Sequence, residues 1–257
     1  SANNGPYGDA IMRELIPYLE QHFRMIRAPG ARFLTGGSTG GWEALALQIY
    51  HPDFFGGTWV LYPDPVDFRS YELVNIYSDT NAFTHQVADW MQAEVPAEVE
   101  VTGQPRITVR MESQFEAVLG SHARSGEQFA IWEATYGPVG PDGYPAELWD
   151  LRTGHIRSDV AAYFRDHDYD LREYLQRTWS TLGPKLRGKL HVFVGDYDTF
   201  YLNLAVYQLE EFLRGAVPRA DAEFGYGRPM KPHGWQPWTN ADLIRIMAAQ
   251  AARRRSP

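Results

Sequence analysis

Apolar positions along the chain fall into short continuous runs that alternate with stretches of helical periodicity. Four short runs predict buried strands, at residues 31–37, 56–65, 189–198 and 222–227. Helical patterns follow three of them, at residues 39–55, at 201–215 and from a cap at Thr239 or Asn240 onward. Strands that alternate with helices predict an α/β fold, with a mostly parallel sheet and flanking crossover helices.

The first segment with helical periodicity precedes all four strands. In residues 9–23, four apolar side chains recur every four positions and predict one buried face: Ile11, Leu15, Leu19 and Phe23. Pro17 lies inside this pattern, and we expect it to bend or shorten the helix.

The alternation stops between the second and third strands. This interval holds a possible hairpin at residues 106–111, several helical pieces and turn-rich sequence. It is too long for a crossover connection, so we interpret about 65–187 as an insertion, or lid, over the carboxyl edge of the sheet. The whole chain, residues 1–257, is then one domain that carries a large insertion.

Composition and charge exclude several classes of function. The chain has 257 residues, of which 44% are apolar and 22% charged, as expected for a packed globular domain. A net charge of −8 argues against nucleic acid as a partner. The absence of cysteine excludes disulfides, thiolate zinc sites and a cysteine nucleophile. No apolar run approaches the length of a membrane span. The compartment is not fixed by these features, and we favour a secreted or periplasmic location over a cytoplasmic one.

A serine between glycines follows the first strand directly. Residues 36–40 read GGSTG and fit the pattern G-x-S-x-G, with an apolar strand before and an amphipathic helix after. In such a tight turn, side chains two residues before and two residues after the serine would collide, which explains glycine at positions 36 and 40. The motif predicts that Ser38 is a nucleophile. The N–H of Thr39, at the start of the helix, is the candidate oxyanion donor. The alternative is an inert glycine-rich turn.

A serine nucleophile needs a base and an acid that orients the base. In this fold the expected chain order is serine, acid, histidine. Asp196 and Asp198 follow the third strand, and we favour Asp198 because it lies further into the loop. Asp64 and Asp67, after the second strand, are rival acids. Among the eight histidines, His233 is the one in a loop after the last strand, and it is the candidate base.

Aromatic residues make up 14% of the chain. Four of them flank the elements that carry the candidate catalytic residues, namely Trp42, Tyr62, Trp235 and Trp238. They are candidates for lining an acyl or alcohol pocket, and ordinary packing is the alternative.

Three segments together resemble a known family. GGSTGGWEALALQIYHPDFFGG, VFVGDYDTFYLN and RPMKPHGWQPW are similar to the putative esterase family of α/β hydrolases, which includes esterase D-like, feruloyl and acetyl-xylan esterase-like, and enterochelin esterase-like enzymes. The resemblance covers residues 5–62 and 188–250. It implies that Ser38 is the nucleophile, His233 the general base and acid, and the residue at position 198 the acid. It implies no metal and no organic cofactor.

The chain departs from this family at its start. The family has several strands before the helix that precedes the nucleophile, whereas here one helix comes first. We therefore expect the carboxyl-terminal portion of an α/β-hydrolase domain that lacks the N-terminal strands of the full fold. The serine strand is then an exposed edge. We expect it to be covered by an N-terminal portion, as a separate or cleaved chain, or by another copy in a homo-oligomer.

These features predict hydrolysis of a carboxylic ester by a Ser-His-Asp triad. Carbohydrate-linked and aromatic esters are candidate substrates, and the sequence does not decide between these and other esters. Hydrolysis of a peptide or amide uses the same triad and stays open. A catalytically inactive relative that binds carbohydrate or acts as a scaffold is the alternative from another class.

Overall fold

The computed structural model describes residues 1–253, which form two compact units. The first, which we call the sheet unit, contains residues 8–66, 175–198 and those from 202 onward. The second, which we call the hairpin unit, contains residues 1–7, 67–174 and 199–201.

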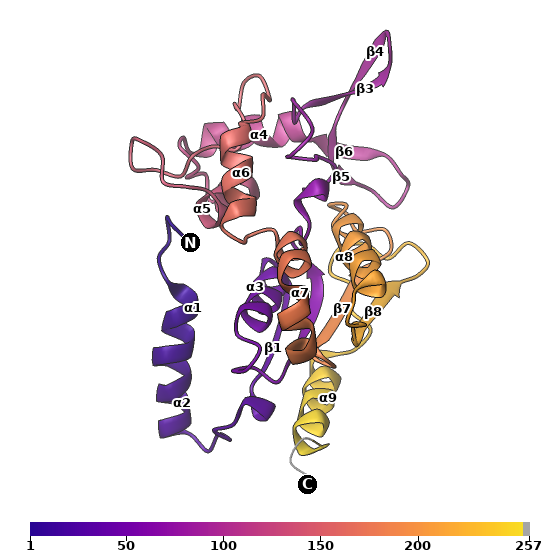
Figure 1. Ribbon diagram of the computed structural model, residues 1–257. Coiled ribbons are helices and arrows are strands. Elements are labelled where there is room, and N and C mark those ends of the chain that lie inside the picture. Colours follow the sequence, from indigo (N-terminus) through magenta and orange to yellow (C-terminus); the bar gives the residue numbers. More distant parts are fainter. Residues whose placement is uncertain (254–257) are drawn as a thin grey trace. The chain divides into compact units, whose positions relative to one another are not determined.

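The sheet unit is built on a four-stranded parallel sheet, in the order β1-β2-β7-β8 (Figure 1). Its strands are β1 (Phe33–Ser38), β2 (Gly57–Pro63), β7 (Leu190–Gly195) and β8 (Ala222–Gly227). All four strands were expected from the apolar runs, and the predicted α/β class with a parallel sheet is confirmed. The residues of β2 are buried except for Tyr62, which explains why the strand appears in the sequence as an unbroken apolar run.

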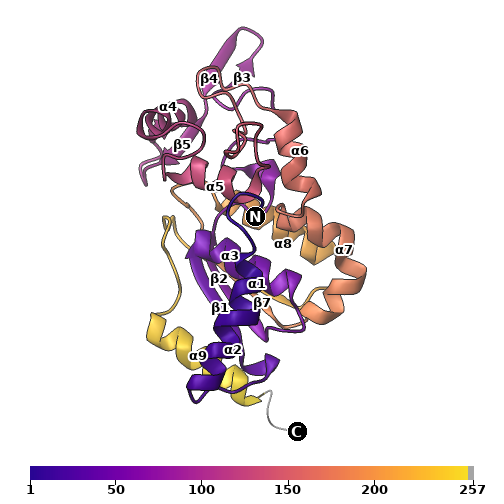
Figure 2. The ribbon, with the colours of Figure 1, turned by 90° about the vertical axis from the view of Figure 1, so that its left-hand side faces the viewer.

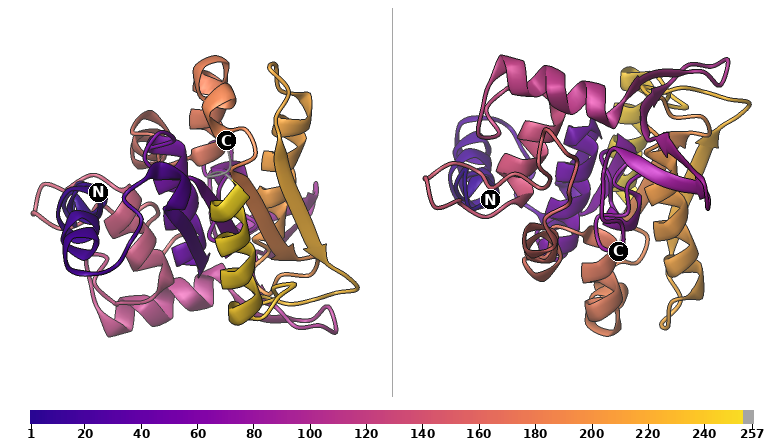
Figure 3. Two further views of the ribbon diagram at one scale, coloured as in Figure 1. Left: turned by 90° about the horizontal axis from the view of Figure 1, so that it is seen from below. Right: turned by 90° about the horizontal axis from the view of Figure 1, so that it is seen from above.

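Helices cover both faces of this sheet. They are α3 (Thr39–Tyr50), α7 (Leu171–Leu186, in this unit from residue 175), α8 (Asn203–Gly215) and α9 (Asn240–Arg253). Figure 3 shows α9 on one face and α7 and α8 on the other. Leu243 of α9 packs with Trp59, Leu61 and Phe193 of the sheet. The cap of α9 is Thr239, whose hydroxyl accepts a hydrogen bond from the N–H of Asp242 (3.2 Å).

The N-terminal helical segment forms, but the predicted buried face is wrong. The segment consists of α1 (Tyr7–Ala10), a π-helical turn (Ile11–Leu15) and α2 (Ile16–His22), and a short 3₁₀ turn (Pro29–Ala31) follows. The hydrogen bonds of a π-helical turn span one residue more than those of an α-helix, so the helical period changes within this segment. Leu15 and Phe23 are 51% and 61% exposed, whereas Met12 and Glu20 are buried. Glu20 forms a bidentate ion pair with Arg32 (2.7 and 3.0 Å).

The serine-bearing strand β1 lies at the edge of the described sheet, with β2 as its partner. An edge strand presents backbone N–H and C=O groups on its outer side. That another polypeptide covers this edge stays a prediction.

The hairpin unit contains two small antiparallel hairpins and three helices. Its elements are a 3₁₀ turn (Phe68–Ser70), β3 (Thr84–Ala88), β4 (Met91–Glu94), β5 (Pro96–Val99), β6 (Pro105–Thr108), α4 (Val109–Leu119), α5 (Gln128–Tyr136) and α6 (Ser158–Asp166). The hairpin of β3 and β4 projects from this unit (Figure 2). Trp90, between the two strands, is 83% exposed.

The predicted hairpin at residues 106–111 forms only up to Thr108, and residues 109–111 are helical. β6 pairs with β5 up to Thr108, but the hydroxyl of Thr108 then accepts a hydrogen bond from the N–H of Met111 (3.3 Å) and caps α4. This capping residue ends the strand and starts a helix inside the segment that the sequence predicts as strand. Within residues 1–253, no helix combines the length and the apolar character that crossing a bilayer requires.

Candidate active site

The turn between β1 and α3 holds Ser38 in a strained backbone conformation. Ser38 is the last residue of β1, with φ 58° and ψ −125°, and α3 begins at Thr39. A non-glycine residue rarely adopts a positive φ, and such strain is typical of functional sites. The β1–β2 register also shifts between Gly37 and Ser38. The turn therefore directs the serine away from the regular path of the strand.

The two glycines that flank this turn at a distance of two residues are not equivalent. A Cβ added to Gly36 would lie 2.1 Å from the carbonyl oxygen of Gly40, which is far inside contact distance. A Cβ added to Gly40 would meet nothing within 4 Å. The steric expectation is therefore confirmed for Gly36 and wrong for Gly40, because the side chain at position 40 would point into open space.

His233 lies within hydrogen-bond distance of both Ser38 and Asp198. Nε2 of His233 is 3.2 Å from Oγ of Ser38, and Nδ1 of His233 is 2.9 Å from Oδ2 of Asp198. An ionised carboxylate only accepts hydrogen bonds, so a neutral imidazole in this contact would carry its proton on Nδ1 and present Nε2 to the serine as an acceptor. The arrangement can remove a proton from the serine hydroxyl.

The geometry distinguishes between the two aspartates that follow β7. Asp198 is 1% exposed, and its Oδ1 accepts a hydrogen bond from the N–H of Leu202 (3.4 Å), which leaves Oδ2 for His233. The carboxylate of Asp196 instead accepts a hydrogen bond from the hydroxyl of Tyr207 (2.5 Å) and pairs with Arg228 (3.2 Å). Asp196 thus has a structural pairing of its own, and Asp198 contacts the imidazole.

The loop that carries His233 passes very close to the end of β7. A Cβ added to Gly195 would lie 2.1 Å from the carbonyl oxygen of Lys231, and the N–H of Tyr197 donates to that same oxygen (3.1 Å). A glycine is required here by this close approach. The contact fixes the loop over the carboxyl end of the sheet, where His233 meets the ends of β1 and β7.

Asp64, immediately after β2, contacts the serine rather than the histidine. Its Oδ1 is 3.3 Å from Oγ of Ser38, its N–H donates to the carbonyl oxygen of Ser38 (3.1 Å), and it is 1% exposed. The sequence suggested Asp64 only as a rival acid for the imidazole. Its signal was the position after the strand next to the serine strand, since the carboxyl ends of neighbouring parallel strands share one edge.

The second rival acid has other partners. Asp67 lies in the hairpin unit, is 1% exposed and forms ion pairs with Arg69 (2.6 Å) and Arg172 (3.6 Å). These two guanidinium groups account for its buried carboxylate without a catalytic role.

One further acidic side chain is electrostatically coupled to the serine turn. The pKa of Glu43, on α3, is raised above its usual value by desolvation and by the negative charge of Asp64. Glu43 therefore holds its proton more tightly than an exposed glutamate does, in part because the charge of Asp64 repels a second negative charge.

Of the four aromatic candidates, Tyr62 lies directly beside the histidine. It has a positive φ of 35°, at the position where the pairing of β1 with β2 skips a residue. Its ring meets that of His233 edge to face, with centroids 4.8 Å apart. The bulge at Tyr62 turns the chain so that Tyr62 and Asp64 both lie at the serine turn.

The three tryptophans have packing contacts. Trp42 is 6% exposed within α3. Trp238 packs edge to face on Phe193, with centroids 4.6 Å apart, and Trp235 lies against the same core. Trp235 and Trp238 are partly buried, so a part of each ring is accessible. Thr39, the candidate oxyanion donor, is the first residue of α3, so its N–H belongs to the first turn of that helix.

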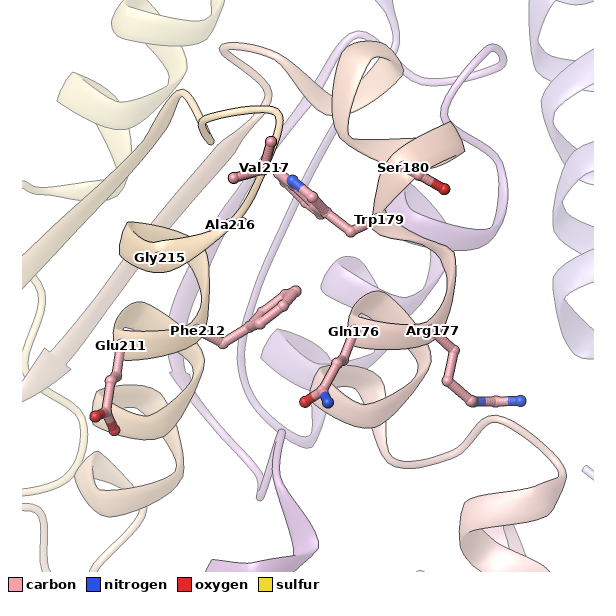
Figure 4. Close-up of a pocket in the computed structure, with 9 residues that line it drawn as sticks. All are labelled: Gln176, Arg177, Trp179, Ser180, Glu211, Phe212, Gly215, Ala216 and Val217. Carbon is pink, nitrogen blue, oxygen red and sulfur yellow. The ribbon is translucent and has the colours of Figure 1, made fainter.

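A separate groove lies between α7 and the end of α8, with a volume of about 550 Å³ (Figure 4). Trp179 and Phe212 point toward each other across it, with ring centroids 5.9 Å apart. The indole N–H of Trp179 donates to the carbonyl oxygen of Pro218 (2.6 Å). None of the predicted catalytic residues lines this groove. Within residues 1–253, no group of three or more His, Asp or Glu side chains is arranged to hold a metal ion.

Comparison with known proteins gives one family match. Residues 2–99 match the model of the family described as putative esterase, and this segment contains Ser38 and Asp64. No curated protein matches the chain. One similar solved structure is the monoacylglycerol lipase of Paleococcus ferrophilus, with 13% identity, a TM-score of 0.36, and coverage of 95% of this chain and 75% of that chain. This match spans less than half of the chain, and it includes the serine strand β1, the helix α3 and the next strand β2.

Proposed function

We propose that this protein is a serine esterase that cleaves carboxylic esters through Ser38, His233 and Asp198. The observation that carries the proposal is the pair of contacts made by one imidazole, to the serine oxygen at 3.2 Å and to the buried carboxylate at 2.9 Å. Both distances are compatible with the nucleophile–base and base–acid contacts that such a triad needs.

The reaction proceeds in two halves. His233 takes the proton of Ser38 as the serine oxygen attacks the ester carbonyl, and it then gives that proton to the leaving alcohol. Water attacks the acyl-enzyme by the same route in reverse and releases the acid. Asp198 holds the imidazole in the tautomer with the proton on Nδ1 and stabilises its charged form.

The start of α3 supplies the stabilising donor for the oxyanion. The N–H of Thr39 follows the nucleophile at a helix N-terminus, where the partial positive charge of the helix favours a negative oxygen. Tyr62 contacts His233 and is the aromatic residue best placed to border a bound ester. In the same proposal, the accessible parts of the rings of Trp42, Trp235 and Trp238 also border the ester pocket. About residues 65–187, which contain most of the hairpin unit, are in the same proposal an insertion in the hydrolase domain.

The experiment that tests the proposal is hydrolysis of p-nitrophenyl acetate and butyrate by wild type and by Ser38→Ala. We expect kcat to fall by about 10³-fold or more, because the covalent route is lost. Ser180→Ala is the matched control: Ser180 is an exposed serine on α7 beside the separate groove, and its loss is expected to leave the rate unchanged. Equal rates for wild type and Ser38→Ala would reject the proposal.

Peptide or amide hydrolysis shares this chemistry, and matched p-nitroanilide substrates separate the two reactions. Activity on the anilide that equals activity on the ester would favour the amidase. An inactive carbohydrate-binding relative would show no turnover of either substrate.

A further inference from the structure

A second carboxylate touches the nucleophile, and nothing in the triad mechanism requires it. Asp64 is joined to Ser38 at two points, through its backbone N–H to the serine carbonyl (3.1 Å) and through Oδ1 to the serine oxygen (3.3 Å). The side chain is 1% exposed, so water screens its charge poorly. The strained bulge at Tyr62 delivers it to this position.

The number of hydrogens at Ser38 limits what these contacts can be. A hydroxyl has one hydrogen to donate, yet its oxygen lies near both Nε2 of His233 and Oδ1 of Asp64. If Asp64 is ionised and takes the hydrogen, Nε2 bonds the serine oxygen only when it carries a proton itself, which makes the imidazole cationic. In that state His233 cannot act as a base. If the imidazole is neutral, Nε2 accepts the serine hydrogen. Asp64 then either has no hydrogen bond from the serine or is protonated and donates its own hydrogen to the serine oxygen.

We propose that Asp64 competes with His233 for the hydrogen of Ser38 and stabilises the protonated imidazole, so that Asp64 sets the pH above which the serine becomes reactive. The inference rests on the proposed function, since it assigns a positioning role within the same site. No net chemical change occurs at Asp64: a proton moves between its carboxylate, the serine hydroxyl and Nε2, and the total number of protons is conserved.

The groups that surround Asp64 reinforce the effect. The carboxylate of Asp64 contacts the hydroxyl of Ser38, at the end of β1. His233, in the loop after β8, contacts the same serine oxygen. Asp198, in the loop after β7, contacts the imidazole of His233. On α3, Glu43 is coupled to the charge of Asp64, and on β2 the ring of Tyr62 covers an edge of His233. Of these three acidic side chains, Asp198 contacts the imidazole, Asp64 contacts the serine oxygen, and Glu43 is coupled to the charge of Asp64.

The test is the pH dependence of the rate at which a fluorophosphonate labels the serine in the full chain. In wild type we expect this rate to rise with pH, because a general base acts in its unprotonated form. In Asp64→Asn, which removes the charge and keeps the shape, we expect the midpoint of this rise to fall by about one pH unit. In Glu43→Gln, which removes a charge that does not contact Ser38, we expect a smaller shift in the same direction.

The outcomes separate this inference from the proposed function. A folded Asp64→Asn with an unchanged or higher midpoint would overturn the role of Asp64 while the esterase proposal stood. Wild type that takes no label at any pH would overturn the esterase proposal itself. Circular dichroism checks the fold of each variant, and Asp64→Ser, which also removes the charge, carries the same expectation if Asp64→Asn is unstable. A purely structural role for Asp64 would lower the amount of folded protein without moving the midpoint.

Discussion

The glycine two residues before the nucleophile offers a substitution whose effect follows directly from the geometry. In Gly36→Ala, the new Cβ would lie 2.1 Å from the carbonyl oxygen of Gly40, where ordinary contacts of a Cβ begin at 3.4 Å. The two atoms must therefore separate by about 1.3 Å, and both belong to backbone that cannot rotate away. The movement falls on the first turn of α3 and on the strand end that holds Ser38.

A displacement of this size has consequences for rate and for stability. A misplacement of about 1 Å at a catalytic group can cost about 100-fold in rate. Overpacking typically costs about 1–3 kcal/mol of unfolding free energy, which for a chain of this length corresponds to a fall in Tm of several degrees. We expect Gly36→Ala to lose about 100-fold in kcat/KM for p-nitrophenyl butyrate, with a lower Tm.

Gly40→Ala is the matched control, because it adds the same methyl group on the other side of the serine. Its Cβ would meet nothing within 4 Å, and alanine favours the helix by up to about 1 kcal/mol relative to glycine. We expect kcat/KM within about threefold of wild type and an unchanged or higher Tm. The reasoning is refuted if Gly36→Ala retains wild-type kcat/KM, or if the two variants lose activity equally.

Two further predictions concern carboxylates. Asp198→Asn is expected to lower kcat by about 10³–10⁴-fold, because the amide favours the wrong imidazole tautomer. Asp196→Asn, at a residue paired with Tyr207 and Arg228, is expected to change kcat by less than about fivefold. Ester hydrolysis by the two purified variants tests this, and the reverse ranking would assign the role of the acid to Asp196. Burial raises the pKa of Glu112, on α4, to about 7 from 4.5, and the nearby carboxylates of Glu116, Glu98 and Glu127 add to the rise. The folded state therefore holds this proton more tightly than the unfolded state, so the contribution to stability is present below pH 4.5 and is lost as pH rises toward 7. Urea unfolding at pH 5 and pH 8 is expected to show that Glu112→Gln reduces this loss by about 1–2 kcal/mol, and an identical pH dependence in both proteins would contradict it.

The strands and the chemistry of their ends could be predicted from sequence because both signals are local. Short segments rich in apolar residues mark the four strands of the parallel sheet, and polar residues directly after these segments lie at one edge of it. Ser38, Asp198 and His233 were each identified by their position relative to a strand. Their mutual contacts follow once the strands lie parallel.

The features that escaped prediction depend on non-local geometry or on departures from a regular period. The π-helical turn at Ile11–Leu15 changes the buried face of the first helix, and no residue in it signals the change of helical period. The contact of Asp64 with Ser38 depends on the bulge at Tyr62, which appears in the sequence as an ordinary strand residue. The open space beside Gly40 likewise depends on the path of the neighbouring chain rather than on the motif.

The measurement that tests the central claim most directly is peptide mapping by mass spectrometry after reaction of the chain with a fluorophosphonate. Wild type is predicted to carry one adduct, on the peptide that contains Ser38, and His233→Ala is predicted to react at least about 100-fold more slowly, since the base that activates the serine is gone. An adduct on another residue, or equal rates of labelling with and without His233, would contradict the account.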